Sequence, residues 1–405
     1  MLLSKRYPDD IHGADGASVS CDAMKLLTQE RVRAYCFIIL GINLLMLSLT
    51  FVRGSKGLTV FGAPVGGDFV AFYVAGRIVN EYGSDRLYDM KLQDTLIHAT
   101  VPEVPANLTN TYVNPPFFAL LFAPLAWLPF IWAYVIWLFF SLLLYVGAVL
   151  LALHLNPVLP RGLTVMTALA FPPFCMYVLG GGQVSAFGCF CLALAMHRAS
   201  TGHRFDSGLV LALLLYKPPL VVLIVPALFW ARRFRILGGF AVGAVLLTVL
   251  CWLLVGTAGL INYARLLQAF GSMIGFGDVR AAKYVDLGAF IRQLFHVSVN
   301  LRPALLLLAL PLTYFLRRDP WGATIPLTLV LNSYATVYDM VLVVPILITT
   351  DTTRLGPWAI VAVFLGSLIG VPIAMITGVQ LLTPLLAWLA WRLYRLSRAA
   401  RILPT

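Results

Sequence analysis

The amino-acid sequence predicts an all-α polytopic membrane protein, a bundle of about twelve transmembrane helices. Hydrophobic residues account for 60% of the 405 residues and charged residues for 11%, whereas a soluble domain carries about 25% charged residues. Many apolar runs approach the roughly 20 residues that a helix needs to span a bilayer. Because lipid offers the backbone no hydrogen-bond partners, such runs form helices. We expect no separate soluble domain.

The basic residues indicate membrane topology rather than a nucleic-acid partner. The formal net charge is +12, but the lysines and arginines stand in short clusters at the ends of apolar runs, as the positive-inside rule describes. The six cysteines and six histidines are scattered, with neither a C-x-x-C nor an H-E-x-x-H motif. We therefore expect no metal site, no cofactor and no bound nucleic acid.

The first helix is expected at 35–52, after a cytoplasmic tail formed by residues 1–33. The tail is too long for the basic region of a signal peptide, and no small-residue cleavage site accompanies the helix. Basic residues of the tail place the N-terminus in the cytoplasm; they are Lys5, Arg6, Lys25, Arg31 and Arg33. The stretch 53–113 then forms a first outer loop.

The next segments alternate in direction across the membrane. Helix 130–153 enters from the outer side, so the short apolar segment 114–130 before it must be a re-entrant or surface hairpin. Helix 163–179 returns outward and helix 184–199 runs inward. Arginines after the last of these helices then fall in the cytoplasm.

The segment 207–230 begins and ends on the cytoplasmic side, so it must turn back midway. Lys217 precedes two prolines, and proline disfavours a helical conformation in the residue before it. We therefore predict two half-length helices that meet at Lys217. The alternative is one kinked span over 207–230, which would invert the preceding segments.

Helix 236–256 leads to a second outer loop, 257–302, and the remaining apolar segments complete one transmembrane domain over 34–395. These segments are 303–316, 321–337, 340–350, 357–377 and 380–395. A basic cytoplasmic tail follows at 396–405.

Polar and charged side chains gather at the outer ends of these elements under this one topology. They are Asp68, Tyr73 and Arg77 of the first loop, Asn114, Gln183, Lys217, and Tyr334, Tyr338 and Asp339 of the segment 332–339. A wet cavity with apolar walls at this face suits an enzyme that joins a lipid-borne donor to an external acceptor.

Each of these residues also has a purely structural interpretation. Asp68 follows two glycines and precedes an apolar run, so its carboxylate is a candidate helix N-cap. Tyr73 and Arg77 are four residues apart on one face of a helix that would lie on the membrane. Lys217 would extend to the outer headgroups. Similar interpretations apply to the others: Asn114 caps a half-helix, Gln183 satisfies a glycine-rich turn, and Tyr338 with Asp339 forms a belt aromatic and a cap.

Five motifs in order along the chain resemble glycosyltransferase family 87, a family of C-type membrane enzymes. They are D-F-x-x-x-Y-x-A-x-R from residue 68, Y-x-N-P-P-F-F-A-L-L-x-A-P-L at 112–125, G-Q-V at 182–184, K-P at 217, and Y-D-x-V-L-x-x-P at 338–345. The resemblance extends from about residue 34 to residue 350. It implies a donor sugar carried on polyprenyl phosphate.

The resemblance implies a metal-independent, inverting transfer and two surface helices in the first loop, at about 68–81 and 88–98. The aspartate that leads the first of these helices, Asp68, is then the catalytic base. An alcohol becomes a good nucleophile when a carboxylate takes its proton, and a phosphate leaving group benefits from cations. The candidate cations are Lys217 and Arg77, followed by Arg280 and Lys283 of the second loop. The candidates for sugar or acceptor binding are Tyr73, Asn114, Gln183, Tyr334, Tyr338 and Asp339.

The expected partners are therefore the lipid-linked donor, membrane lipids, and a glycolipid or polysaccharide acceptor. Some relatives that transfer mannose carry histidines where this chain has Tyr334 or Tyr338 and Asp339, so the chain departs from them at this segment. Mannose is the first candidate sugar on family grounds alone. We expect a bacterial inner membrane protein with its site on the periplasmic or extracellular side. The alternative functions are a lipid-linked sugar flippase or transporter, and a structural protein of the envelope.

Overall fold

The structure is a computed structural model that describes residues 28–52, 58–60, 64–102, 110–273, 282–296, 302–332 and 334–399. Helices dominate this part of the chain, and the described residues contain no β-strand, only two isolated bridges. The predicted all-α class is therefore confirmed. The tails predicted at 1–33 and 396–405 lie largely outside the described residues, although helix α2 begins at Gln29 and helix α18 continues to Ala399.

The N-terminal half contains a long first helix, two helices before a short hairpin, and a second long helix. The elements are α2 (Gln29–Leu49), α3 (Phe69–Glu81), η2 (Ser84–Arg86), α4 (Met90–Thr100), α5 (Pro116–Ala119), η4 (Leu125–Trp127), α6 (Phe130–Leu155), α7 (Arg161–Leu169), η5 (Pro173–Leu179) and α8 (Ser185–Ser200). The predicted helices 130–153 and 184–199 are confirmed as α6 and α8.

The C-terminal half begins with a broken segment and a very long helix. The elements are α9 (Arg204–Ala212), η6 (Leu213–Tyr216), η7 (Pro218–Val221), α10 (Ile224–Trp230), α11 (Phe234–Met273), α12 (Leu287–Phe295), α13 (Arg302–Leu316), α14 (Thr324–Leu331), η9 (Val337–Leu342), α15 (Val343–Thr349), α16 (Thr352–Leu355), α17 (Pro357–Thr377) and α18 (Leu382–Ala399). The predicted break at Lys217 is confirmed, because its backbone is extended (φ −138°, ψ 82°) between η6 and η7.

Within the described ranges, four helices are long and apolar enough to cross a membrane, namely α2, α6, α11 and α17, and the bent pair α7 and η5 would make a fifth. The chain is thus a membrane protein, but length and composition do not confirm the predicted count of about twelve crossings. Residues 218–230, 307–316 and 337–349 form apolar helices below the spanning length.

Three predicted elements differ from the structure. The segment 163–179 is not one helix: it bends by 49° where Pro172 and Pro173 interrupt the backbone hydrogen bonds. The loop predicted at 257–302 is helical as far as Met273, because Gly256 kinks α11 without ending it. Helix α3 does not lie on the surface, since nine of its thirteen residues are buried, as expected of a helix that is apolar on most sides.

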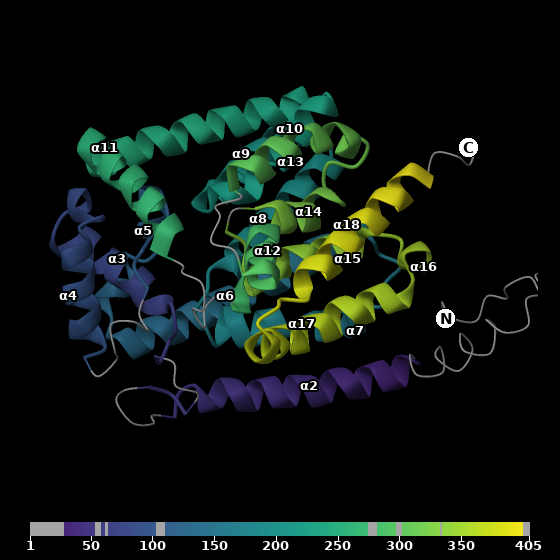
Figure 1. Ribbon diagram of the computed structural model, residues 1–405, viewed down its shortest axis with the longest axis horizontal. Coiled ribbons are helices and arrows are strands. Elements are labelled where there is room, and N and C mark those ends of the chain that lie inside the picture. Colours follow the sequence, from purple (N-terminus) through teal and green to yellow (C-terminus); the bar gives the residue numbers. More distant parts are fainter. Residues whose placement is uncertain are drawn as a thin grey trace, which may run out of the picture.

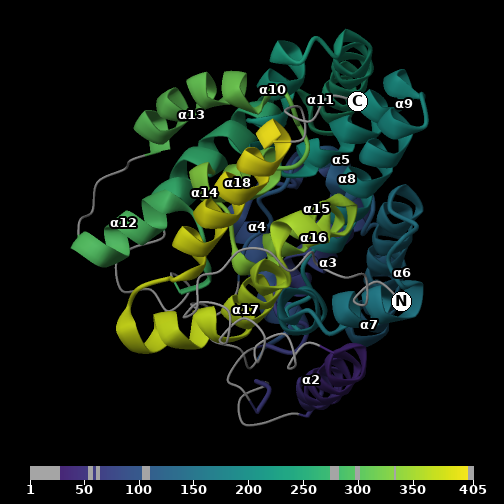
Figure 2. The same cartoon turned by 90° about the vertical axis from the view of Figure 1, so that its right-hand side faces the viewer.

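Different helices form the two ends of the molecule (Figure 1). Helices α3 and α4 lie at one end, whereas α2 begins and α18 finishes at the opposite end. Helix α11 runs along the edge that faces away from α2, and Figure 2 shows α17 and α18 between these two edges. The core that joins the elements is rich in aromatic side chains, with Phe69, Phe122 and Trp137 fully buried against one another.

Candidate active site

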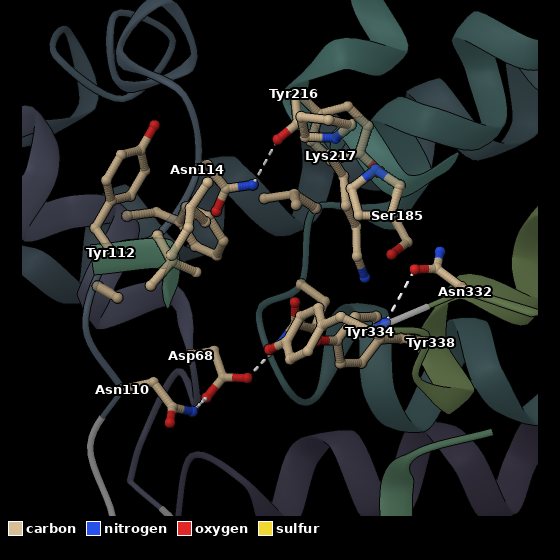
Figure 3. Close-up of a pocket in the computed structure, with 18 of the residues that line it drawn as sticks. Asp68, Asn110, Tyr112, Asn114, Ser185, Tyr216, Lys217, Asn332, Tyr334 and Tyr338 are labelled. Atoms are coloured by element: carbon tan, nitrogen blue, oxygen red, sulfur yellow. Dashed lines mark hydrogen bonds between the residues drawn. The ribbon is translucent and has the colours of Figure 1, made fainter. Parts of the chain in front are cut away.

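A cavity of about 430 Å³ lies where the start of α3 meets the Lys217 break and the segment 332–338. The segment 110–114 and the turn 183–185 complete its polar wall (Figure 3). Aliphatic side chains from three other elements line another part of it: Val222 and Leu223 after η7, Leu267 of α11, and Leu331 of α14. The cavity therefore offers polar and apolar surroundings to one ligand.

Asp68 lies on the wall of this cavity and is only half-buried. It occupies the N-cap position of α3, but its side chain makes no capping hydrogen bond. Instead, the Asn110 Nδ2 group donates to Asp68 Oδ1 over 2.5 Å, and the Gln183 Nε2 group donates to Oδ2. The carboxylate is thus held by two side-chain amides and faces the cavity, in contrast to the capping interpretation.

Two glycine-rich stretches bring Asp68 and Gln183 together. The Asp68 backbone N–H donates to the Gly181 carbonyl oxygen over 2.9 Å. Gly67 (φ 52°) and Gly182 (φ 63°) have left-handed backbones at this crossing, and a Cβ atom at Gly67 would lie 2.7 Å from the Gly181 oxygen. Because only glycine tolerates both the conformation and the close approach, these residues explain the G-G-D and G-G-G-Q sequences.

Lys217 enters the cavity from the break between η6 and η7, and only 9% of the residue is exposed. Its Nζ atom lies 2.5 Å from Asp339 Oδ2. The same ammonium lies 5.0 Å from the ring centroid of Tyr334 and 5.1 Å from that of Tyr338, within the range of cation–π attraction. A cation is therefore fixed between an anion and two aromatic rings.

Asp339 is completely buried and does not line the cavity. Its Oδ1 atom accepts a hydrogen bond from the Ser185 hydroxyl (2.9 Å), and its Oδ2 atom accepts one from the Thr336 backbone N–H (3.0 Å) as well as from Lys217. The predicted contact between Asp339 and a sugar hydroxyl does not fit this geometry, because both oxygens already have protein partners. The capping interpretation is correct in part, since Thr336 and Asp339 form a capping box at η9.

The other predicted residues divide into those at the cavity and those away from it. Asn114, Gln183, Tyr334 and Tyr338 line the cavity. The Asn114 amide also donates to the Tyr216 carbonyl oxygen over 3.0 Å, which joins the hairpin segment to the Lys217 break.

Tyr73 and Arg77 are not brought to the cavity. The Tyr73 ring is buried on another face of α3, and its hydroxyl donates to the Leu128 carbonyl oxygen over 2.8 Å. Arg77 pairs with Glu81 one turn later at 2.7 Å, and this partner lowers the pKa of the Glu81 carboxyl. The i,i+4 spacing predicted their helix correctly, but the pattern contained no information about which face meets the cavity.

The two candidates of the second loop contribute little to the described site. Lys283 is exposed and is not a lining residue, although the ring of its neighbour Tyr284 contacts that of Tyr334, with centroids 5.4 Å apart. Arg280 lies outside the described residues. Lys217 is therefore the lysine or arginine that lines the cavity within the described ranges.

The polar residues at the cavity that sequence reasoning missed include Asn110, Ser185 and Asn332. Ser185 and Asn332 stand inside the polar stretches 180–185 and 332–339, so those stretches held a signal for them. Asn110 lies two residues before the Y-x-N-P-P motif and had none. The described residues contain no group of three or more histidine, cysteine or acidic side chains that would hold a metal ion.

Comparison with known proteins identifies one family. The model of glycosyltransferase family 87 matches residues 112–345, more than half of the chain. The match includes Asn114, Gln183 and Lys217 but begins after Asp68. No curated protein and no solved structure matches the chain.

Proposed function

The chain belongs to glycosyltransferase family 87, and from that premise we propose that it transfers a sugar from a polyprenyl-phosphate donor to an acceptor hydroxyl, with inversion. Asp68 is the general base in this proposal, and Lys217 is the cation beside the leaving phosphate. Mannose is the first candidate sugar, and a glycolipid or polysaccharide is the acceptor.

The observation that carries the proposal is that a half-buried carboxylate, Asp68, and an ammonium group, Lys217, both line the wall of one cavity. Asp68 has a free approach from the cavity, and Lys217 is anchored across the turn 183–185 from it (Figure 3). The aliphatic lining by Val222, Leu223 and Leu267 suits the isoprenoid chain of a lipid-linked donor.

The transfer is a single displacement. The acceptor hydroxyl gives its proton to Asp68 while its oxygen forms a bond to the anomeric carbon of the sugar. The bond between that carbon and the phosphate oxygen breaks, and its electron pair leaves with polyprenyl phosphate. A positioned base contributes about 10²- to 10⁴-fold to such a step, and a fixed cation stabilises the charge that develops on the departing phosphate. Attack from the opposite face inverts the anomeric carbon.

We further propose that residues 34–395 form one transmembrane domain of about twelve crossings, with the short helices completing the count. The tails 1–33 and 396–405 are cytoplasmic, and the cavity opens on the outer side of a bacterial inner membrane. Support comes from the basic ends of α2 and α18, which lie at the end of the molecule opposite to α3 and α4.

The test is sugar transfer by purified protein in detergent, with a panel of polyprenyl-phosphate sugars that begins with mannose. Asp68→Asn keeps the size of the side chain but loses the base, so we expect transfer to fall about 10²- to 10⁴-fold while the donor still binds. The matched control is Asp89→Asn. Asp89 caps α4 by accepting from the Leu92 N–H over 3.1 Å, and asparagine caps equally well, so this variant should transfer sugar like wild type.

Equal activity in Asp68→Asn and wild type would return Asp68 to a structural role. Absence of transfer from every donor, with lipid-linked sugar still moved across vesicle membranes, would favour the flippase.

A further inference from the structure

The buried partner of Lys217, Asp339, has no direct route to a substrate. The residue is 0% exposed. Its Oδ1 atom accepts from Ser185, and its Oδ2 atom accepts from Lys217, from the Thr336 N–H and, over 3.1 Å, from the Thr336 hydroxyl. Each carboxylate oxygen has about two lone-pair positions, so the donors on Oδ2 fill that atom, while Oδ1, which accepts from Ser185, is buried and does not line the cavity. Any effect of Asp339 on catalysis must therefore pass through a neighbour, and Lys217 is the one of its described hydrogen-bond donors that carries a charge.

The Lys217 ammonium is held on one side and open on the other. It has three N–H donors, and among the described residues one donor meets Asp339 while Tyr334 and Tyr338 contribute ring faces rather than acceptors. Two donors remain for a ligand oxygen. Figure 3 shows the Lys217 side chain extending towards the space between Ser185, Asn332 and Tyr334.

A lysine has a long, flexible side chain and a compact charge. An unrestrained ammonium beside the lipid-linked sugar would therefore move into contact with its phosphate already in the bound ground state. In this structure the Asp339 carboxylate competes with the substrate phosphate for the Lys217 ammonium before the reaction begins. The bound donor is a phosphodiester with one negative charge, whereas the departing polyprenyl phosphate gains a second. A cation that is fixed in place therefore gains most as the bond breaks, and this difference accelerates the step.

We propose that Asp339 is a positioning residue: it holds the Lys217 ammonium at the point where charge develops on the leaving phosphate, and it weakens ground-state attraction for that phosphate. The inference rests on the proposed function and adds a role to a residue that contacts no substrate. It predicts opposite effects of one substitution on rate and on affinity.

The test compares wild type, Asp339→Asn, Lys217→Met and the double variant, in full-length protein in detergent. Two quantities are measured: kcat for sugar transfer, and the Kd of undecaprenyl phosphate as a probe of the phosphate position. We expect Asp339→Asn to lower kcat about 10- to 100-fold through displacement of the cation, yet to bind the probe more tightly than wild type. Lys217→Met should lose both, and Asp339→Asn should change neither quantity in the Lys217→Met background.

Thr336→Val serves as the matched control for the capping role of Asp339. It removes the Thr336 hydroxyl, with its hydrogen bond to Asp339 Oδ2 and the side-chain half of the capping box at η9, but leaves the Thr336 N–H donor and the Lys217–Asp339 ion pair in place. We expect a lower melting temperature with kcat within about threefold of wild type. If Thr336→Val reproduced the kcat loss of Asp339→Asn, the role of Asp339 would be capping alone and the proposal would be wrong.

Three further results would decide whether Asp339 positions Lys217. A kcat for Asp339→Asn within twofold of wild type overturns positioning, and so does an equal loss of rate and affinity in both Lys217 backgrounds. If wild type transfers no sugar from any donor, the proposed function fails and the binding measurement alone decides. Tighter probe binding in Asp339→Asn that requires Lys217 would then keep the inference, and unchanged binding would reject it.

Discussion

Two aspartates meet one short turn of the chain, and their surroundings differ sharply. Asp68 is half-buried at the cavity and is held by amide groups that carry no charge. Asp339 is fully buried, is bound to a cation and accepts from protein donors on both oxygens. The same functional group is therefore left available in one place and consumed in the other. Burial and partners, rather than residue type, separate a candidate base from a counter-ion.

The turn 180–185 connects these two regions. Gly181 accepts from the Asp68 backbone, Gln183 donates to the Asp68 carboxylate, and Ser185 donates to Asp339. A few residues thus set the distance between the proposed base, Asp68, and the ion pair of Asp339 with Lys217. Such a separation must hold to a fraction of an ångström for a displacement reaction.

The largest effect is expected from Gly182→Ala, which disturbs both regions at once. The new Cβ atom would meet the Gly66 carbonyl oxygen and would lie 2.6 Å from the Phe69 Cβ atom, in a left-handed backbone. Backbone strain of about 1–3 kcal/mol and a shift of the turn should lower kcat about 100-fold.

The measurement for Gly182→Ala is kcat for sugar transfer together with the melting temperature in detergent. Gly162→Ala is the control, because a Cβ atom there meets nothing within 4 Å. Wild-type activity in Gly182→Ala would mean that the turn adapts and does not set the separation.

A smaller and one-sided effect is expected from Gln183→Met. The substitution removes one of the two amide groups that donate to Asp68 among the described residues and keeps the length of the side chain, so the Asn110 amide remains as the donor there. A hydrogen bond to a charged group contributes about 1.5–3 kcal/mol, so we expect kcat to fall about 10-fold.

The readout that isolates the Asp68 side is the Kd of undecaprenyl phosphate, which depends on Lys217 and should not change in Gln183→Met. Asn110→Ala should behave in the same way, because it removes the other amide donor. A large loss of probe affinity in either variant would show that the two regions are not separable.

The smallest effect is expected from Arg77→Gln, which touches neither region. Arg77 pairs with Glu81 on the outer face of α3, and an exposed i,i+4 pair contributes about 0.3–0.5 kcal/mol. The pKa of Glu81 is lowered by this pair, so the contribution is present at neutral pH and disappears as the pH falls through the folded-state pKa of Glu81. Melting temperatures of wild type and Arg77→Gln should therefore converge in acid, with sugar transfer within about twofold. A tenfold loss of transfer would bring Arg77 back into the site.

Local chain chemistry accounts for the features that were predicted correctly. Proline after Lys217 forces the extended residue that breaks the segment 207–230, and uninterrupted apolar runs become α6 and α17. The polar stretches around Asp68, Gln183, Lys217 and Tyr338 were expected to lie near one another because one topology placed them all at outer helix ends. The structure lines one cavity with them.

Other features depend on contacts that no local pattern contains. Which face of α3 meets the cavity decides that Asp68 lines it and that Tyr73 and Arg77 do not. The extent of α11 depends on whether Gly256 ends or only kinks the helix, which the packing of later residues decides.

By itself the sequence determined that this protein is a helical membrane protein, that its backbone breaks at Lys217, and which polar stretches gather at one cavity. Hydrophobic length and proline chemistry act within a few residues, so they can be read along the chain. Only the tertiary structure decided which aspartate faces the cavity and which is bound to Lys217. Burial and ion pairing join residues more than one hundred positions apart, and such distances are closed by packing alone.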